Sequence, residues 1–137
     1  MFTLTDYVGP HADSPDWTDE RSAQAERLIA ACTKLQALMV ADGVKFQINP
    51  HTGTTISGVI YGGFRPQSCK EGAPHSAHKE GQAVDRYDPL NEIDTWILDH
   101  QDVLVTCGIY IEHPSATPGW SHWGIRAPAS GRHVFYP

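Results

Sequence analysis

The sequence predicts a single α+β domain over residues 1–137, in which helices pack on one side of a small, mostly antiparallel sheet. Three observations predict this class. A chain of 137 residues has room for one hydrophobic core but hardly for two. Its hydrophobic patterns follow the order helix, strands, helix, strands, which is typical of α+β proteins. The 12 glycines and 10 prolines indicate many turns between short elements.

An irregular lead-in and a long helix are predicted first. Residues 1–17 show little periodicity and end at an N-cap, Asp16 or Thr18. An amphipathic helix is then predicted over 19–41, before the stop signal Asp42-Gly43. Its apolar positions recur at intervals of three and four residues: Leu28, Ala31, Leu35, Leu38 and Met39.

A hairpin is predicted next. Residues 44–48 read as a strand, and residues 54–61, which are rich in β-branched side chains, read as its partner. The turn sequence at 49–53 separates them. Glycines and a proline over 62–66 then break the pattern and open a loop to about Ser76.

A second helix is predicted with Asp88 as N-cap and Pro89 at its first position, ending near His100. Its apolar face consists of Leu90, Ile93, Trp96 and Ile97. A further helical turn is predicted over 102–107, before Gly108.

Three strands follow in the prediction. Residues 109–112 and 121–126 read as two strands of one hairpin, joined by a loop rich in proline, serine and glycine. A last short strand is predicted over 133–136.

Composition and charge argue against several classes of protein. Hydrophobic residues make up 40% and charged residues 19%, as in a folded globular chain. With a formal net charge of −6, the chain lacks the excess of basic residues that is typical of nucleic-acid binders, so we expect no nucleic-acid partner. No apolar stretch approaches the roughly 20 residues of a membrane span, and we identify no signal peptide. We therefore expect synthesis in the cytoplasm.

The cysteines and histidines narrow the kind of site. Cys32, Cys69 and Cys107 are an odd number at wide spacings, which argues against a disulfide framework and against a thiolate zinc site. The eight histidines offer neutral imidazoles, the commonest metal ligands in proteins. The positions of the histidines are therefore informative.

The segment from Ser76 to Asp85 carries the strongest chemical signal. It places the imidazole of His78 and the carboxylate of Asp85 seven positions apart, with the small residues Gly81 and Ala83 between them. Nitrogen and oxygen ligands suit Zn²⁺, which takes three protein ligands in catalytic sites. The best third ligand is His122, which lies between two tryptophans on the late hairpin.

The pattern S-x-H-x-x-G-x-A-x-D, followed by a histidine on a hairpin, resembles the D-alanyl-D-alanine carboxypeptidase family of zinc peptidases. That family includes vancomycin-resistance dipeptidases and phage L-Ala-D-Glu endolysins, and it is related in fold to hedgehog and lysostaphin domains. The resemblance covers about residues 62–126. It implies that fold, with one Zn²⁺ per chain on His78, Asp85 and His122, and it carries the family's arginine onto Arg65 in Gly63-Phe64-Arg65-Pro66.

The sequence departs from the family at the catalytic carboxylate. Many members place this acid three residues before the third zinc ligand, where this chain has Gly119. The nearest acid upstream of His122 is Glu112, on the preceding predicted strand. If the two strands pair, Glu112 and His122 become cross-strand neighbours, and Glu112 is our candidate for the general base. If the pairing turns Glu112 to the opposite face, the site is weakly active or purely binding.

The resemblance implies metal-assisted amide hydrolysis. Zinc lowers the pKa of its bound water towards ~7, and a carboxylate transfers the proton to the leaving amine. Arg65 is expected to steady the oxyanion or a substrate carboxylate. Ser76 is expected to fix the loop or to contact substrate. Trp120 belongs either to the core or to the substrate surface.

The leading hypothesis is a monomeric zinc peptidase of the D,D-carboxypeptidase, dipeptidase or L-Ala-D-Glu endopeptidase type. Its substrates would be peptidoglycan stem peptides or D-Ala-containing dipeptides. The displaced acid leaves a second reading, a non-catalytic zinc-binding module of a phage particle or a cell-wall-binding module, and a purely structural zinc domain is a third. Because a charge of −6 gives no help in adhering to an anionic wall, we expect a phage-tail or holin-type partner to deliver the protein, either within the particle or at lysis.

Overall fold

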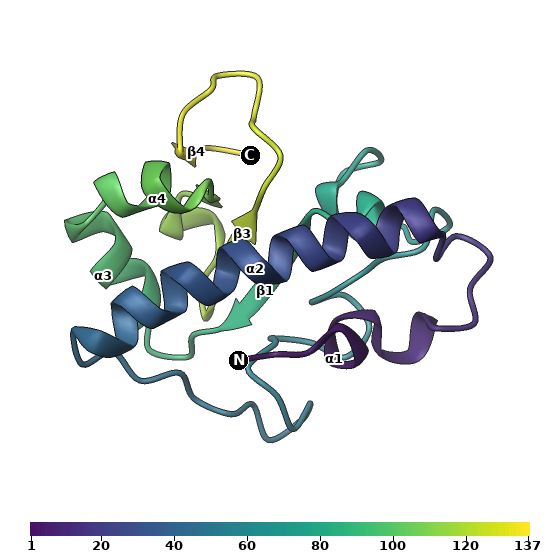
Figure 1. Cartoon of the computed structure of the whole chain (residues 1–137), viewed down its shortest axis with the longest axis horizontal. Coiled ribbons are helices and arrows are strands. Elements are labelled where there is room, and N and C mark those ends of the chain that lie inside the picture. The colour runs from purple at the N-terminus through teal and green to yellow at the C-terminus, as the bar shows by residue number, and fades with distance from the viewer.

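The computed structural model describes all 137 residues and is α+β, with a small mixed sheet and four α-helices (Figure 1). The helices are α1 (Leu4–Val8), α2 (Asp19–Ala41), α3 (Glu92–Asp99) and α4 (Asp102–Cys107). The strands are β1 (Ala83–Tyr87), β2 (Tyr110–Glu112), β3 (Trp120–Gly124) and β4 (Val134–Phe135). Single 3-10 turns are η1 (Gly9–His11), η2 (Ala77–Glu80) and η3 (Pro114–Ala116). None of the helices is both long and apolar enough to cross a membrane.

Helix α2 forms where the periodicity predicts it. The side chain of Thr18 accepts a hydrogen bond from the backbone N–H of Arg21, which caps the first turn. The buried stripe recurs at three- and four-residue steps: Ala25, Leu28, Cys32, Leu35 and Met39. The expected stripe was partly wrong, because Leu38 faces solvent and Ala31 is only half-buried.

The sheet has the strand order β1-β3-β2-β4. Strand β3 pairs antiparallel with both β1 and β2, whereas β4 runs parallel to β2. The predicted pairing of 109–112 with 121–126 is therefore confirmed, although β3 begins at Trp120 and ends at Gly124. The last strand is shorter than the predicted range 133–136.

The two faces of the sheet have different neighbours. Because side chains alternate along a strand, Val84, Ile111 and Trp123 lie on one face and join the hydrophobic core with α2. In Figure 1, α2 crosses the sheet, and α3 and α4 lie near the C-terminal half of α2. The opposite face carries Asp85 and His122, so the core holds the strands while the other face is left for chemistry.

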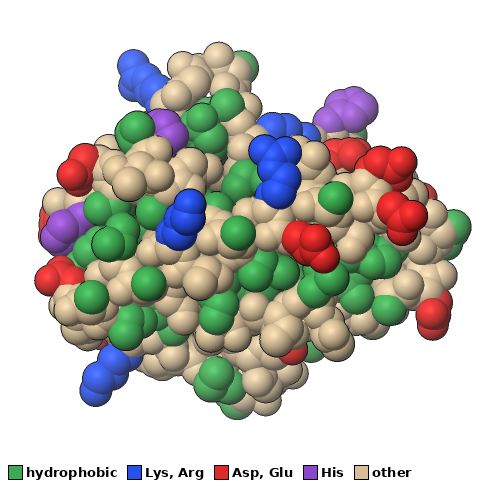
Figure 2. Space-filling view, viewed as in Figure 1, with side chains coloured by type: hydrophobic (Ala, Val, Ile, Leu, Met, Phe, Trp, Pro, Cys, Tyr) green, Lys and Arg blue, Asp and Glu red, His purple; other side chains and the backbone are tan.

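The surface of the helical side carries both signs of charge. Figure 2 shows basic and acidic side chains interspersed with apolar ones on this face. The α2 side therefore presents no extended patch of one sign in this view.

The hairpin predicted over 44–48 and 54–61 is wrong. The side chain of Asn49 accepts from the backbone N–H of His51 and donates to the carbonyl of Ser57, so it folds this segment into local turns. Ile56 alone makes a bridge, to Arg86 on β1. Four of the residues that suggested a strand are exposed, Ile48, Val59, Ile60 and Tyr61, whereas Thr55 and Ile56 are buried.

Two boundaries also differ from the sequence prediction. The lead-in contains α1, whose capping box joins Thr3 and Asp6. The second helix begins at Glu92, because residues 89–91 form a turn before it and Leu90 is exposed. Asp88 still caps this helix, since its carboxylate accepts from the backbone N–H groups of residues 93 and 94.

Candidate metal centre

His78 is positioned by a short 3-10 turn that packs against α2. Ser76 caps this turn by accepting the backbone N–H of His78, and Gly81 ends it in the left-handed conformation with φ 74°. A Cβ at Gly81 would overlap the carbonyl oxygen of Arg21, so only glycine allows this close approach. The motif therefore presses the turn against α2 and leaves His78 only 2% exposed.

Asp85 and His122 are brought together by the strand register. They are direct partners in the antiparallel pair of β1 and β3, so their side chains leave the same face of the sheet. Both residues are buried. Strand β1 was not predicted from the sequence, yet this strand is what fixes the carboxylate of Asp85.

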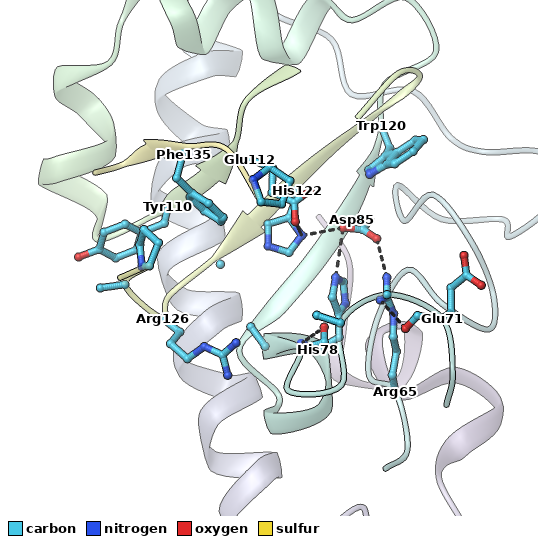
Figure 3. Close-up of a pocket in the computed structure, with 18 residues that line it drawn as sticks. Arg65, Glu71, His78, Asp85, Tyr110, Glu112, Trp120, His122, Arg126 and Phe135 are labelled. Atoms are coloured by element: carbon cyan, nitrogen blue, oxygen red, sulfur yellow. Dashed lines mark hydrogen bonds and ion pairs between the residues drawn. The ribbon is translucent and has the colours of Figure 1, made fainter. Parts of the chain in front are cut away.

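Three potential ligand atoms converge at this point (Figure 3). Asp85 Oδ1 lies 3.2 Å from His78 Nε2 and 3.0 Å from His122 Nδ1. One ligand atom from each residue lies within 4.8 Å of the other two, a spacing that allows a single ion to contact all three. The structure thus brings together the three residues that the sequence nominated.

The donor set fits a cation. His78 Nδ1 lies 2.8 Å from the carbonyl oxygen of Gly63, and because a carbonyl only accepts, Nδ1 carries the proton. In the neutral ring, Nε2 then presents a lone pair towards the carboxylate of Asp85. Two acceptors facing each other in a buried site require either a proton or a metal ion between them. A His–Asp–His set of this kind can hold a divalent ion.

The electrostatics of the cluster assign its protons. Burial lowers the pKa of His78 despite the attraction of Asp85, so this ring is neutral. Burial also disfavours charged His122, but the hydrogen bond and charge of Asp85, aided by Glu112, raise its pKa above the ordinary value. Burial likewise disfavours ionised Asp85, yet the two imidazoles hold the pKa of that carboxyl well below its usual range. The raised pKa favours a proton on His122, and a bound cation would replace that proton and would also separate the two acceptors, His78 Nε2 and Asp85 Oδ1.

Arg65 holds the other oxygen of the carboxylate. Its Nη2 donates to Asp85 Oδ2 at 3.1 Å, while its Nε donates to the carbonyl of Tyr61 at 2.7 Å. The sequence placed Arg65 beside the motif as an oxyanion or substrate group. The structure places its guanidinium against Asp85 instead, so its clearest contact orients a metal ligand.

Glu112 lies on the same face of the sheet as the cluster. The β2–β3 register pairs Ile111 with Trp123, and the next pair along the strands sets Glu112 opposite His122. Glu112 Oε1 lies 3.9 Å from His122 Nδ1, and 24% of its side chain is exposed. The condition set by the sequence, cross-strand neighbours facing the same way, is met.

A cleft of about 410 Å³ opens over the cluster. Ser76 and Trp120 line it together with Arg65 and Glu112. The 62–85 segment forms one wall. The remaining wall was not predicted, and it is formed by these residues: Tyr110, Arg126, Ala127, Pro128, Phe135 and Pro137. Arg126 carried no motif in the sequence, and β4 brings Phe135 to the site through pairing that local sequence does not specify.

The arrangement combines a buried set of metal ligands with a partly exposed carboxylate in an open cleft. A cation at such a site lies next to a group that can accept a proton, which are the elements of metal-assisted hydrolysis. Comparisons with protein-family models, with curated proteins and with solved structures gave no match to this chain.

Proposed function

We propose that this protein is a zinc-dependent peptidase that hydrolyses amide bonds in peptidoglycan stem peptides or D-Ala-containing dipeptides. One observation carries the proposal: two imidazole nitrogens and a carboxylate oxygen converge within 4.8 Å in a cleft that also contains the partly exposed carboxylate of Glu112. The resemblance of the Ser76–Asp85 segment to zinc peptidases of cell-wall peptides supports the choice of metal and substrate.

The three ligands would be His78 Nε2, an Asp85 oxygen and His122 Nδ1. A zinc ion held there would supply Lewis acidity, which lowers the pKa of water and polarises a carbonyl oxygen. The chain supplies the orientation of these ligands. The carbonyl of Gly63 fixes the tautomer of His78, and Arg65 fixes the carboxylate of Asp85.

Glu112 is the candidate general base. Its carboxylate faces His122 across the strand pair and remains partly open to solvent, so water can reach it. In the proposed reaction Oε1 accepts a proton from the attacking water and returns it to the leaving amine. The acid that other members carry three residues before the last histidine is thus replaced from the neighbouring strand, because Gly119 has no side chain to supply it.

Ser76 and Trp120 would contact the peptide at the rim of the cleft. Ser76 is already engaged by the backbone of His78, so its hydroxyl serves the turn first. Trp120 is the first residue of β3 and is half-buried, which suits a ring that covers a substrate side chain.

The test is amine release from purified zinc-loaded protein. Muropeptides, crosslinked and uncrosslinked, and D-Ala-D-Ala are incubated with the protein, and new amino groups are quantified. Glu112→Gln should bind zinc normally and lose about 10²- to 10⁴-fold in rate, because it removes the proton acceptor and leaves the ligands intact. Glu26→Gln, on the exposed side of α2, is the matched control and should keep full activity.

The same experiment separates peptidase from binding module. A non-catalytic wall-binding member would bind zinc and cell walls, release no amine and be indifferent to Glu112→Gln. Zinc binding without amine release from any of these substrates, while a control enzyme cleaves them, would therefore refute the proposed activity.

A further inference from the structure

A second guanidinium lies in the cleft, apart from the metal ligands. Arg126 follows β3 by two residues, is exposed, and lines the cleft. Its Nη2 donates to the carbonyl of His75 at 2.7 Å, so the side chain reaches across from the end of β3 to the wall that carries His78 (Figure 3). One of its five N–H groups is thereby used, and the fork remains available on the cleft side.

Arg65 is not available in the same way. Its Nε, Nη1 and Nη2 each donate to a protein oxygen, on Tyr61, Glu71 and Asp85 respectively. A Cβ at Gly72 would lie 2.6 Å from Nη1, so the loop closes against the guanidinium. Its charge is neutralised by Asp85, and the residue is only 8% exposed. An anionic group on a substrate would have to displace these contacts to use Arg65.

Arg126 has no such counter-charge. No carboxylate lies within 4.0 Å of its guanidinium, since it takes part in none of the ion pairs of the structure. The acids of the cleft, Glu71, Asp85 and Glu112, would repel an anion that had no cation to receive it. Arg126 is therefore the cationic side chain of the cleft that is free to pair with a ligand.

The surroundings of Arg126 are apolar. Ala127 and Pro128 follow it directly, and Phe135 lies on the same side of the cleft, with its ring edge-on to His122 at 6.4 Å. A ligand carboxylate that pairs with Arg126 against these side chains would itself shield part of the contact from water, which strengthens a charge-assisted hydrogen bond. This end of the cleft thus fits a carboxylate that is attached to a small apolar group.

We propose that Arg126 binds a free carboxylate of the substrate peptide and so selects peptides with such a group close to the amide at the metal centre. The proposal rests on the proposed function and deepens it. Arg126 lies four residues after His122, so their Cα atoms are at most about 14 Å apart. A carboxylate paired with Arg126 would therefore lie within a few peptide units of an amide bound at the metal centre.

Two sources of this carboxylate share the chemistry. One is the C-terminal carboxylate of a peptide ending in D-Ala-D-Ala, and the other is the α-carboxylate of a γ-linked D-Glu that follows L-Ala. Two matched pairs of probes separate them. The first pair is acetyl-Lys-D-Ala-D-Ala and its C-terminal amide. The second is L-Ala-γ-D-Glu-L-Lys and the same peptide with the α-carboxylate of D-Glu as an amide.

The experiment measures binding and turnover separately. Calorimetry gives Kd for the four probes on zinc-loaded protein carrying Glu112→Gln, so that the probes are not consumed. The kcat/KM of each probe is measured with Glu112 intact. Arg126→Gln is compared in both assays with Arg132→Gln, which removes an exposed arginine outside the cleft. Arg126→Lys keeps the charge and loses the fork.

We expect at least one acid to bind about 10- to 100-fold more tightly than its amide, as a charge-assisted hydrogen bond implies. Arg126→Gln should abolish this preference, Arg126→Lys should keep part of it, and Arg132→Gln should keep all of it. The pair that shows the preference identifies the source of the carboxylate.

Equal affinity for acid and amide in both pairs, including no binding of either, would overturn the proposal. So would a preference that survives Arg126→Gln, since the carboxylate would then be held by the metal or by Arg65. Failure of the proposed function is a different result: no probe is cleaved with Glu112 intact, whatever the calorimetry shows.

Discussion

Replacing Asp85 by Asn tests whether the buried network stabilises the fold before any metal binds. Asp85 accepts from Arg65 and from His122, and the pairing side chains are nearly enclosed, with 9% and 11% of the Arg65 and Asp85 side chains exposed. Asparagine keeps the shape and removes the negative charge. Arg65 is then left as a buried cation without a counter-charge.

The burial of the Arg65–Asp85 ion pair sets the free-energy cost of this substitution. Removing one partner of a buried ion pair costs about 3–5 kcal/mol, and a domain of this length loses about 4 °C of Tm per kcal/mol, so Tm should fall by about 12–20 °C. The pKa of Asp85 lies below its unfolded value, so its contribution is fully present above about pH 4 and is lost only as the pH falls further. The difference in unfolding free energy between the parent protein and Asp85→Asn should therefore become smaller at acid pH.

Chemical denaturation in the presence of EDTA at neutral pH measures this cost. Asp13→Asn, an exposed acid that makes no hydrogen bond or ion pair in the structure, is the control and should stay within about 0.5 kcal/mol of the parent. If Asp85→Asn unfolds at the same denaturant concentration as Asp13→Asn, the network contributes nothing and the reasoning is refuted.

Three further predictions concern the support of the site. Gly63→Ala should destabilise the protein by about 1–3 kcal/mol and weaken metal binding. A Cβ at Gly63 overlaps the carbonyl of Tyr7 and shifts the Gly63 carbonyl oxygen that orients His78. The control is Gly58→Ala, where a Cβ has room, and it should change neither the denaturation midpoint nor the zinc titration. Burial raises the pKa of Asp94 to about 6, so its ionisation should cost the native state about 3 kcal/mol as the pH rises from about 4 to above 6. Asp94→Asn should remove this pH dependence of the free energy of unfolding, measured by denaturation at several pH values. The same pH dependence in Asp94→Asn and in the parent protein would contradict the prediction. Chelation should lower Tm but leave a cooperative unfolding transition, because the hydrophobic core contains none of the three ligands; loss of the circular dichroism spectrum on chelation would favour a structural zinc domain.

The three candidate metal ligands could be nominated from the sequence, because His78 and Asp85 lie in one motif and His122 lies on a predicted hairpin. Gly81 marks the tight turn after His78. The loop between residues 112 and 121 indicates that the two flanking strands pair, which sets His122 and Glu112 on one face of the sheet. The family resemblance gave Arg65 a role at the oxyanion or at a substrate carboxylate, and nothing in the sequence indicated its ion pair with Asp85. The free charge of Arg126 had no local signal, since it depends on where the chain turns after β3.

The false hairpin has a different cause. Thr54, Thr55 and Ile56 have high strand propensity, but strand propensity reflects packing more than backbone preference. Hydrogen bonds from the side chains of Asn49 and Thr52 to the nearby backbone compete with a strand ladder, and the segment keeps only the single bridge from Ile56 to Arg86.

Strand β1 was missed because its alternation is hidden. Both of its faces are buried, and the charged pair Asp85-Arg86 gives no polar–apolar pattern. Arg86 points into the core, where its guanidinium lies 4.6–5.1 Å from the ring centroids of Phe2, Phe46 and Trp123. Three rings from distant parts of the chain accommodate this cation, and no window of sequence around Arg86 contains that information.

The central claim is that His78, Asp85 and His122 hold one zinc ion. The most direct test is anomalous diffraction at the zinc edge from crystals grown with zinc. The account predicts one peak at about 2.0–2.2 Å from His78 Nε2, His122 Nδ1 and an oxygen of Asp85. No anomalous peak at this point, or a zinc ion bound through His122 Nε2 and away from Asp85, would contradict this claim.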